Sequence, residues 1–399
     1  MKKRILAAVL ALALVLAAAM PATAKSTAKS PTLRFDENGE FKILHICDCQ
    51  DTYPAEEDMF TYINHMLDYY EPDLVVLGGD NTVGPAETKE LAIKELVAPY
   101  VEHEIPFTLV FGNHDEECGN ISKDVLLTYY QKYGGKYCLA YDADPKISGT
   151  GAHNLPVLAS DSNDIKFNVW MFDTGDYVAD ENGKRLGYDS VREDQINWYK
   201  ETAKGLEKQA GATVPAIAFQ HMIVGEIYEV MFPELPFELG DLTETYNNGK
   251  HYPIVCPDTS VFKGHLFEPP SPGPFNYVQV DAMLEIGDVK GIFVGHDHYN
   301  TYEVNYKGIQ LVNTPGVTLH SYDTALTRGS RLITINEENP EKIKSKVITY
   351  NDLVIKSSDF AKEAGISKIE AAFWIFAEHF LLLLKNISGF GSAILYLFN

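Results

Sequence analysis

Short apolar runs alternate with longer amphipathic segments along most of the chain. Five runs have the length and the Val, Ile, Leu and Phe content of buried β-strands, and they span residues 41–47, 73–77, 106–110, 214–219 and 289–294. Segments with apolar residues at helical spacing follow the first three runs, at residues 58–70, 87–100 and 121–133. Strands that alternate with helices in this way predict an α/β fold made of βαβ units.

The same alternation continues through the second half of the chain. Further strands are predicted at residues 167–172, 302–306, 309–312, 331–336 and 345–350, and further helices at residues 191–208 and near 278–286. The segment 223–275 is long, rich in Pro, Gly and aromatic residues and only weakly periodic, so we interpret it as a loop that caps a site. Residues 34–355 are therefore predicted to form one domain, preceded by a flexible lead-in at residues 25–33.

Residues 1–24 have the composition of a cleavable signal peptide. A basic cluster at residues 2–4 precedes an apolar run at residues 5–20, and Ala22 and Ala24 fit the small-residue rule for cleavage. This leader predicts a secreted, extracytoplasmic protein and is typical of bacterial export. An uncleaved signal anchor is the alternative.

The last segment, residues 356–399, is strongly apolar. Glu378, His379 and Lys385 interrupt its apolar runs, and none of these runs approaches the ~20 residues that a membrane-spanning helix needs. We favour a helix that docks on the core or contacts another subunit. The alternative is peripheral contact with a membrane surface. The oligomeric state stays open.

The charge of the chain limits the substrates to consider. It has 33 Lys and Arg against 56 Asp and Glu, for a formal charge of −23. Removal of the leader takes away three basic residues, which leaves 30 against 56, or −26. Such a surface repels nucleic-acid backbones at long range, so a nucleic-acid polymer is not the expected substrate.

The chain has five cysteines, an odd number that cannot all pair within one molecule. A bridge between Cys118 and Cys138 is one interpretation, and free or buried thiols are the other. No spacing typical of a zinc finger or a redox-active CxxC motif occurs among them.

Polar residues that suit metal binding follow each of the five main strands. They are Asp48 and Gln50, Asp80 and Asn81, Asn113 with His114 and Asp115, His221, and lastly His296 and His298. Ligand sites in α/β proteins gather at the carboxyl ends of strands, so these side chains are expected on one rim. Such a rim predicts a site with more than one metal ion, whose reaction is attack of a metal-activated water on an electrophile, most often phosphorus.

The order and spacing of these motifs resemble the calcineurin-like metallophosphoesterase family. The family pattern D-x-H, G-D-x-x-D/N, G-N-H-D/E, a lone H and G-H-x-H appears here as D-C-Q, G-D-N, G-N-H-D, His221 and G-H-D-H. The stretches 264–277 and 287–291 resemble a narrower branch, the purple-acid-phosphatase-29-like phosphatases. The resemblance implies a four-layer α/β/β/α sandwich, in which helices flank two mixed β-sheets.

The resemblance also implies a role for each residue. Two divalent ions are expected, drawn from Mn, Fe, Zn, Mg or Ca, with Asp80 as the bridge between them. Asp48, Gln50 and His298 would bind the first ion, and Asn113, His221 and His296 the second. His114 would be the general acid, with its neighbour Asp115 orienting and charging the imidazole.

Gln50 departs from the family pattern, which has His at this position. An amide oxygen is a harder and weaker ligand than imidazole, which favours Mn²⁺, Mg²⁺ or Ca²⁺ over Zn²⁺ at the first site. Asp51 is a candidate for a supporting contact beside it. Thr82, Val83 and Gly84 follow Asn81, so no tyrosine follows the bridging carboxylate and a colourless protein is expected.

The predicted activity is hydrolysis of a small phosphorylated substrate. A phosphomonoesterase is favoured by the branch resemblance, and the segment 264–277 would limit the size of the alcohol group. A phosphodiesterase or nucleotidase on the same dinuclear site is the first alternative. A non-catalytic exported binding protein, with Gln50 as the mark of a degraded site, is the second.

Overall fold

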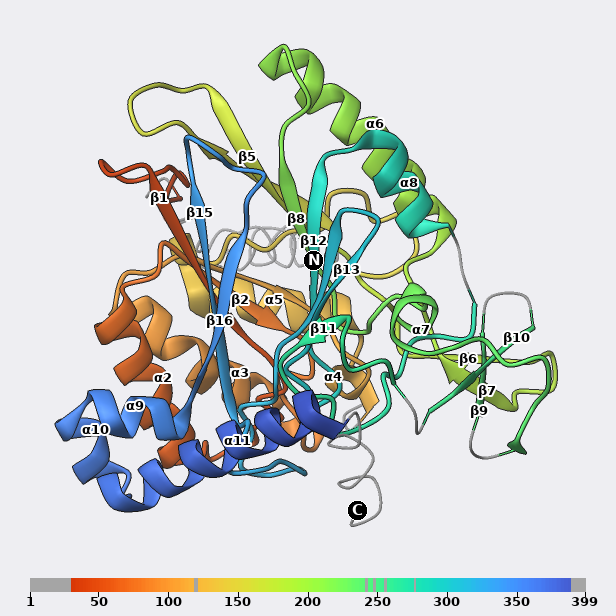
Figure 1. The fold of residues 1–399 in the computed structure, drawn as a ribbon. Helices are drawn as coiled ribbons and strands as arrows, with labels where there is room; N and C mark the ends of the chain where they lie inside the picture. Colours follow the sequence, from red (N-terminus) through yellow and green to blue (C-terminus); the bar gives the residue numbers. More distant parts are fainter. Residues whose placement is uncertain are drawn as a thin grey trace, which may run out of the picture.

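Two mixed β-sheets contain the predicted strands, and helices cover their outer faces (Figure 1). The computed structural model describes residues 30–117, 121–240, 243–246, 249–254, 257–275 and 278–388. The predicted signal peptide therefore lies outside the described residues, as do Cys118 and the end of the apolar tail. Cys138 has a free, buried thiol.

The first sheet has five strands in the order β16-β15-β1-β2-β3. Its strands are β1 (Glu40–Ile46), β2 (Leu74–Gly78), β3 (Phe107–Val110), β15 (Gly329–Asn336) and β16 (Lys344–Thr349). β1, β2 and β3 are parallel, whereas β15 and β16 are antiparallel additions at one edge. The connections contain α2 (Glu57–Tyr70), α3 (Ala86–Glu102), α4 (His114–Glu117), α5 (Lys123–Gly134) and the 3₁₀ turn η1 (Gly135–Tyr137).

The second sheet has seven strands in the order β11-β13-β14-β12-β8-β5-β4. Its strands are β4 (His153–Leu158), β5 (Ile165–Met171), β8 (Ala216–Phe219), β11 (Phe262–Lys263), β12 (Val289–Val294), β13 (Glu303–Tyr306) and β14 (Ile309–Asn313). β5, β8, β12 and β14 are parallel in the middle of the sheet. Helices α6 (Glu193–Ala210) and α8 (Gln279–Ile286) cover its outer face (Figure 1).

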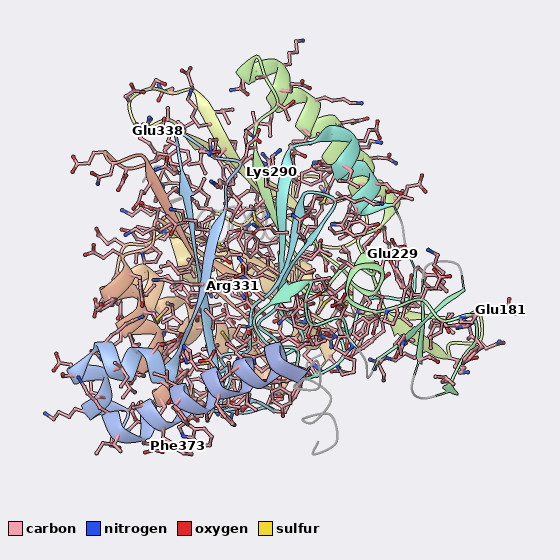
Figure 2. The ribbon with its side chains drawn as sticks, in the orientation of Figure 1. Glu181, Glu229, Lys290, Arg331, Glu338 and Phe373 are labelled. Atoms are coloured by element: carbon pink, nitrogen blue, oxygen red, sulfur yellow. The ribbon has the colours of Figure 1, made fainter. Side chains whose placement is uncertain are left out.

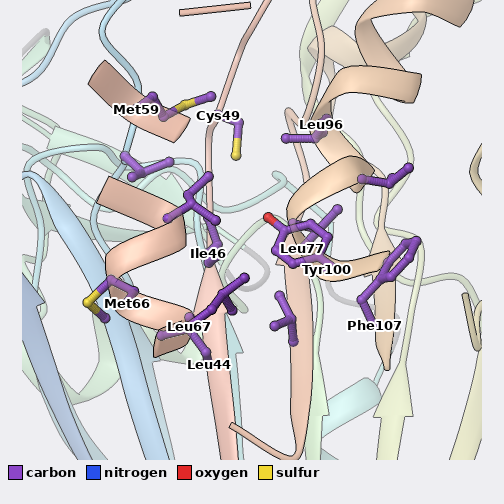
Figure 3. Close-up of a cluster of buried hydrophobic side chains, with 14 of the residues drawn as sticks. Leu44, Ile46, Cys49, Met59, Met66, Leu67, Leu77, Leu96, Tyr100 and Phe107 are labelled. Atoms are coloured by element: carbon purple, nitrogen blue, oxygen red, sulfur yellow. The ribbon is translucent and has the colours of Figure 1, made fainter. Parts of the chain in front are cut away.

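Three apolar cores separate four layers. Alternation along β1 shows how the strands serve two of them: Leu44 and Ile46 face the helices, whereas Phe41 and Ile43 face the other sheet. Figure 3 shows the core under the helices, where the labelled side chains are Leu44, Ile46, Cys49, Met59, Met66, Leu67, Leu77, Leu96, Tyr100 and Phe107. The third core lies between the second sheet and its own helices. This arrangement confirms the predicted α/β/β/α sandwich.

Some short elements were not predicted. The segment expected to be a cap loop contains α7 (Glu226–Met231), the hairpin β9 (Thr243–Tyr246) to β10 (Lys250–Pro253), and β11. The hairpin β6 (Tyr177–Ala179) to β7 (Arg185–Tyr188) was also missed, because strands of three or four residues are too short to show a period. β4 was not predicted because it contains Pro156, and proline argues against a strand in the middle of a sheet. β4 lies at the edge of its sheet, where proline is tolerated.

The C-terminal tail is helical where it is described. After α9 (Tyr350–Lys356) and α10 (Ser358–Glu363), α11 (Lys368–Ser388) packs against α9 and buries Ala371. Apolar side chains line the opposite face of α11 and are exposed, among them Phe373, which points away from the body of the molecule (Figure 2). In the described parts of the chain, no helix is both long and apolar enough to cross a membrane.

Candidate metal centre

The polar residues that follow five parallel strands meet at one edge of the sandwich. Asp48 and Gln50 follow β1, Asp80 follows β2, Asn113 and His114 follow β3, His221 follows β8, and His296 and His298 follow β12. All of them are buried except His114, whose side chain is 38% exposed. The ligand atoms of Asp80, His221 and His296 lie within 4.8 Å of one another. The two sheets therefore contribute to one site, as the strand pattern predicted.

The backbone at the site is held in an unfavourable conformation. Asp48, Gln50, Asp80 and His296 have φ values of 53°, 42°, 49° and 69°. Residues other than glycine rarely adopt this left-handed region, and they persist there only where the surrounding structure imposes it. Strain at four predicted ligands indicates that the fold gives up some stability to direct these side chains inward.

Gly112 allows the backbone to pass close to Asp80. A Cβ atom at Gly112 would lie 2.1 Å from Asp80 Oδ1, a distance that no side chain could occupy. Gly79 serves the same purpose on the other side, where a Cβ atom would lie 2.4 Å from His221 Nδ1. The glycines of the G-N-H-D and G-G-D motifs are thus required by close approach to the centre.

His221 and His298 are oriented by backbone carbonyl groups. His221 Nδ1 donates to the carbonyl oxygen of Gly78 at 2.9 Å, and His298 Nδ1 donates to that of Tyr322 at 2.7 Å. Each ring therefore directs Nε2 inward, toward a carboxylate. His221 Nε2 lies 3.3 Å from Asp80 Oδ2, and His298 Nε2 lies 3.5 Å from Asp48 Oδ1. A cation between these groups would find two imidazole nitrogens and two carboxylates.

Two buried ligand atoms in the centre have no hydrogen-bond partner: His221 Nε2 and Asn113 Oδ1. The amide of Asn113 is fixed from its other end, because Nδ2 donates to the hydroxyl of Tyr177 at 2.9 Å. Buried polar atoms without partners are costly, and a metal ion would satisfy both of these. The donor set therefore fits a divalent cation.

Gln50 lies against the bridging carboxylate, where its Nε2 donates to Asp80 Oδ2 at 3.3 Å. In this orientation the amide nitrogen faces the centre, and a half turn of the amide would present the oxygen instead. Asp51 does not support Gln50 as expected. Its carboxylate instead accepts hydrogen bonds from the backbone of Thr52 and Glu56 and lies 3.1 Å from His320 Nε2.

The charges in the centre compensate one another without a cation. Burial opposes charge on Asp80 and His221, but their attraction holds the pKa of Asp80 well below its usual range and raises the pKa of His221 to about 10. Burial raises the pKa of Asp48 well above its usual range. The imidazolium of His221 is thus the counter-charge for the carboxylates. A divalent cation would take over this role and release the proton.

The predicted partner of His114 was wrong. The carboxylate of Asp115 accepts backbone hydrogen bonds from Gly112, Asn81 and Thr82 at 2.8, 3.0 and 3.1 Å and so holds the loops of the centre together. His114 Nδ1 is hydrogen-bonded to Glu117 instead. His114 and Glu117 both lie on α4. In a helix, residues three apart share a face, whereas neighbours in sequence such as His114 and Asp115 point in different directions.

Aromatic side chains that the sequence analysis did not identify surround the ligands. The ring of Tyr188 meets that of His296 edge-on with centroids 4.3 Å apart, and Tyr322 stacks on His298 at 4.1 Å. Arg185 Cζ lies 3.2 Å from the ring centroid of Tyr177. Tyr177, Arg185 and Tyr188 lie on the hairpin β6–β7. Its one signal in the sequence was the Asn-Gly pair at residues 182–183.

A comparison with family models agrees with the pattern of motifs along the chain. Residues 41–300 match the model described as calcineurin-like phosphoesterase, which is well over half of the chain. The chain belongs to the calcineurin-like phosphoesterase family. Membership of this family of hydrolases confirms the resemblance that the motifs indicated.

Relatives of this family member occur in plants and yeast. It is 28% identical over 322 residues to "Probable inactive purple acid phosphatase 14" of Arabidopsis thaliana, covering 73% of each chain. It is 27% identical over 343 residues to "Probable inactive purple acid phosphatase 29" of the same plant, covering 78% of this chain and 81% of the relative. "Phosphatase DCR2" of Saccharomyces cerevisiae is 24% identical over 68% of this chain and 46% of its own.

Proposed function

We propose that this chain is a secreted, metal-dependent phosphoesterase that hydrolyses phosphate monoesters. The observation that carries the proposal is the pair of buried, unpartnered ligand atoms, His221 Nε2 and Asn113 Oδ1, beside two carboxylates. Two divalent cations, when bound, supply the Lewis acid that activates water and polarises the phosphoryl group. The residues that would hold them are Asp48, Gln50 and His298 on one side, Asn113, His221 and His296 on the other, and Asp80 between.

His114 is placed to protonate the leaving alcohol. It is the most exposed member of the set, and its Nε2 lies 3.9 Å from Asp80 Oδ2, so the ring faces both the centre and the solvent. Glu117 is hydrogen-bonded to Nδ1 at the other end of the ring and so fixes the orientation of the imidazole. A proton on Nε2 can then pass to the ester oxygen as its bond to phosphorus breaks.

A non-catalytic role is the alternative that the plant relatives raise, because their names include the word inactive. A phosphodiesterase or nucleotidase on the same residues is the other alternative. The decisive experiment measures metal content and turnover together on the purified protein. Hydrolysis of an aryl phosphate monoester and of a matched aryl diester is followed with Mn²⁺, with Zn²⁺ and with EDTA.

The proposal expects metal in the protein, turnover of the monoester and complete loss of turnover in EDTA. Metal without turnover would indicate a binding protein, and faster diester hydrolysis would indicate the diesterase. Full activity in EDTA would contradict the metal-dependent mechanism.

Secretion has its own test, which is N-terminal sequencing after expression with the leader in an exporting bacterial host. A mature chain that starts at Lys25 supports secretion, and one that starts at Met1 contradicts it.

A further inference from the structure

A cavity of about 400 Å³ lies beside the metal centre, within the range of small-molecule sites. The hairpin β6–β7, strand β9 and the proline-rich segment 268–274 enclose it. Tyr188 belongs both to its wall and to the centre, since its ring contacts that of His296. The cavity and the centre therefore lie on either side of the ring of Tyr188.

The proline-rich wall is attached directly to the loop that carries two ligands. Glu268 accepts a hydrogen bond from the backbone of Tyr299 at 2.8 Å, one residue after His298. The backbone of Ser271 donates to Asp297 Oδ2 at 3.4 Å, between the two histidine ligands. The distance between the cavity and the centre is thus set by hydrogen bonds.

The side chains that line the cavity are acidic and aromatic. Glu244 and Glu268 contribute carboxyl groups, and Tyr188, Tyr228 and Tyr246 contribute rings. None of the described lining residues is Lys, Arg or His. Within the described chain, the carboxylate of Glu244 has no ion-pair partner, and burial raises its pKa. The lining disfavours an anionic guest and suits a cationic one.

A positive side chain lies on the hairpin that separates the cavity from the predicted ligand Asn113. Arg185 covers the ring of Tyr177, whose hydroxyl group accepts the hydrogen bond of the predicted ligand Asn113. The hairpin therefore has a guanidinium group over Tyr177 and Tyr188, and it presents Tyr188 to the acidic cavity. A metal centre that would hold phosphate, with an acidic cavity next to it, complements a molecule with phosphate at one end and a cation at the other.

We propose that the cavity binds the alcohol portion of the substrate and selects phosphate monoesters of amino alcohols, with a primary or quaternary ammonium group. The proposal rests on the proposed function of the metal centre. The carboxylates attract the ammonium group, and the tyrosine rings add cation–π contact. In the reaction, the oxygen of water bonds to phosphorus as the bond from phosphorus to the alcohol oxygen breaks. That oxygen takes a proton, and the products are inorganic phosphate and the free amino alcohol.

The experiment compares phosphocholine with 3,3-dimethylbutyl phosphate, which has the same shape without the positive charge. Rates are measured at pH 8, above the pKa of about 7 to which burial raises Glu268. The expected kcat/KM is about tenfold higher for phosphocholine, the size of one favourable cation site. Glu244→Gln and Glu268→Gln should each lower this ratio by about threefold or more. Glu181→Gln is the control. Glu181 is exposed at the tip of the hairpin β6–β7 and lies outside the cavity (Figure 2).

Equal kcat/KM values for the two esters would overturn the inference and leave the proposed function intact, because both esters would still be hydrolysed. If no ester is hydrolysed, the proposed function fails, and binding decides the inference separately. Titration calorimetry would then compare choline with 3,3-dimethylbutan-1-ol on the metal-loaded protein. Tighter binding of choline that weakens in Glu244→Gln supports the cation site, and equal Kd values overturn it.

Discussion

The metal centre and the cavity beside it share a wall but are built in different ways. Every ligand of the centre follows a strand of the two large sheets, and buried backbone hydrogen bonds fix the loops between them. The cavity is enclosed by two small hairpins and a proline-rich segment that belong to neither sheet. On the proposed function, the strand ends would carry the reaction and the insertions would select the ester. Substitutions in the two regions should differ in what they change.

The sharpest test of this comparison is Asp80→Ala. Asp80 is buried among His221, the backbone of His114 and Gln50, so its loss removes the acceptor that these groups share. We expect metal content and turnover to fall together to the level of the EDTA-treated protein. Metal analysis and aryl phosphate hydrolysis on the same sample measure both. Full metal content in Asp80→Ala would show that Asp80 is not a bridge.

His114→Ala should separate chemistry from metal binding. The His114 side chain is 38% exposed and is not a predicted metal ligand. The metal content should therefore stay that of the wild type. The kcat should fall by about 10²–10⁴. The loss should be largest for alkyl esters, which need a proton on the leaving oxygen, and smaller for nitrophenyl esters. A kcat close to that of the wild type on an alkyl ester would exclude the acid role.

The sequence predicted Asp115 as the partner of His114, whereas the structure has Glu117 there. This difference separates what the strand pattern can predict from what it cannot. Asp48, His221 and the other predicted ligands could be placed together from the sequence, because the ends of parallel strands share one edge whatever the loops do. The partner of His114 depended on where α4 begins, which no period in four residues reveals. Tyr188 and Tyr322 were missed for a related reason. Tyr188 ends β7, a strand too short to show a period, and Tyr322 lies on a loop whose path only tertiary contacts decide.

Tyr177→Phe tests whether the hairpin also supports the centre. Its hydroxyl group accepts the hydrogen bond that holds Asn113 with Oδ1 free. Loss of such a supporting contact should weaken metal binding by about 10-fold, with the fold unchanged. Tyr141→Phe is the control, because the hydroxyl group of Tyr141 also makes one hydrogen bond, which it donates to the carbonyl oxygen of Asn154. Equal metal affinities of the two variants would place Tyr177 outside the centre and sharpen the boundary between the two regions.

Gln50→His tests the predicted ligand at which this chain departs from the family pattern. Imidazole nitrogen is a better donor to Zn²⁺ than an amide oxygen, so the weaker of two Zn²⁺ dissociation constants should tighten by about tenfold, with a smaller change for Mn²⁺. Titration of the metal-free protein with each ion measures this directly. Turnover is a poorer readout, because a tighter site can also retain phosphate.

If the weaker Zn²⁺ constant does not change, Gln50 does not face the metal. Asp51 is then a poor substitute, because its carboxylate already accepts hydrogen bonds from Thr52 and Glu56 and pairs with His320. Asp48 and His298 would have to hold the first ion without a third protein ligand. Such a site would lose its metal first on dilution.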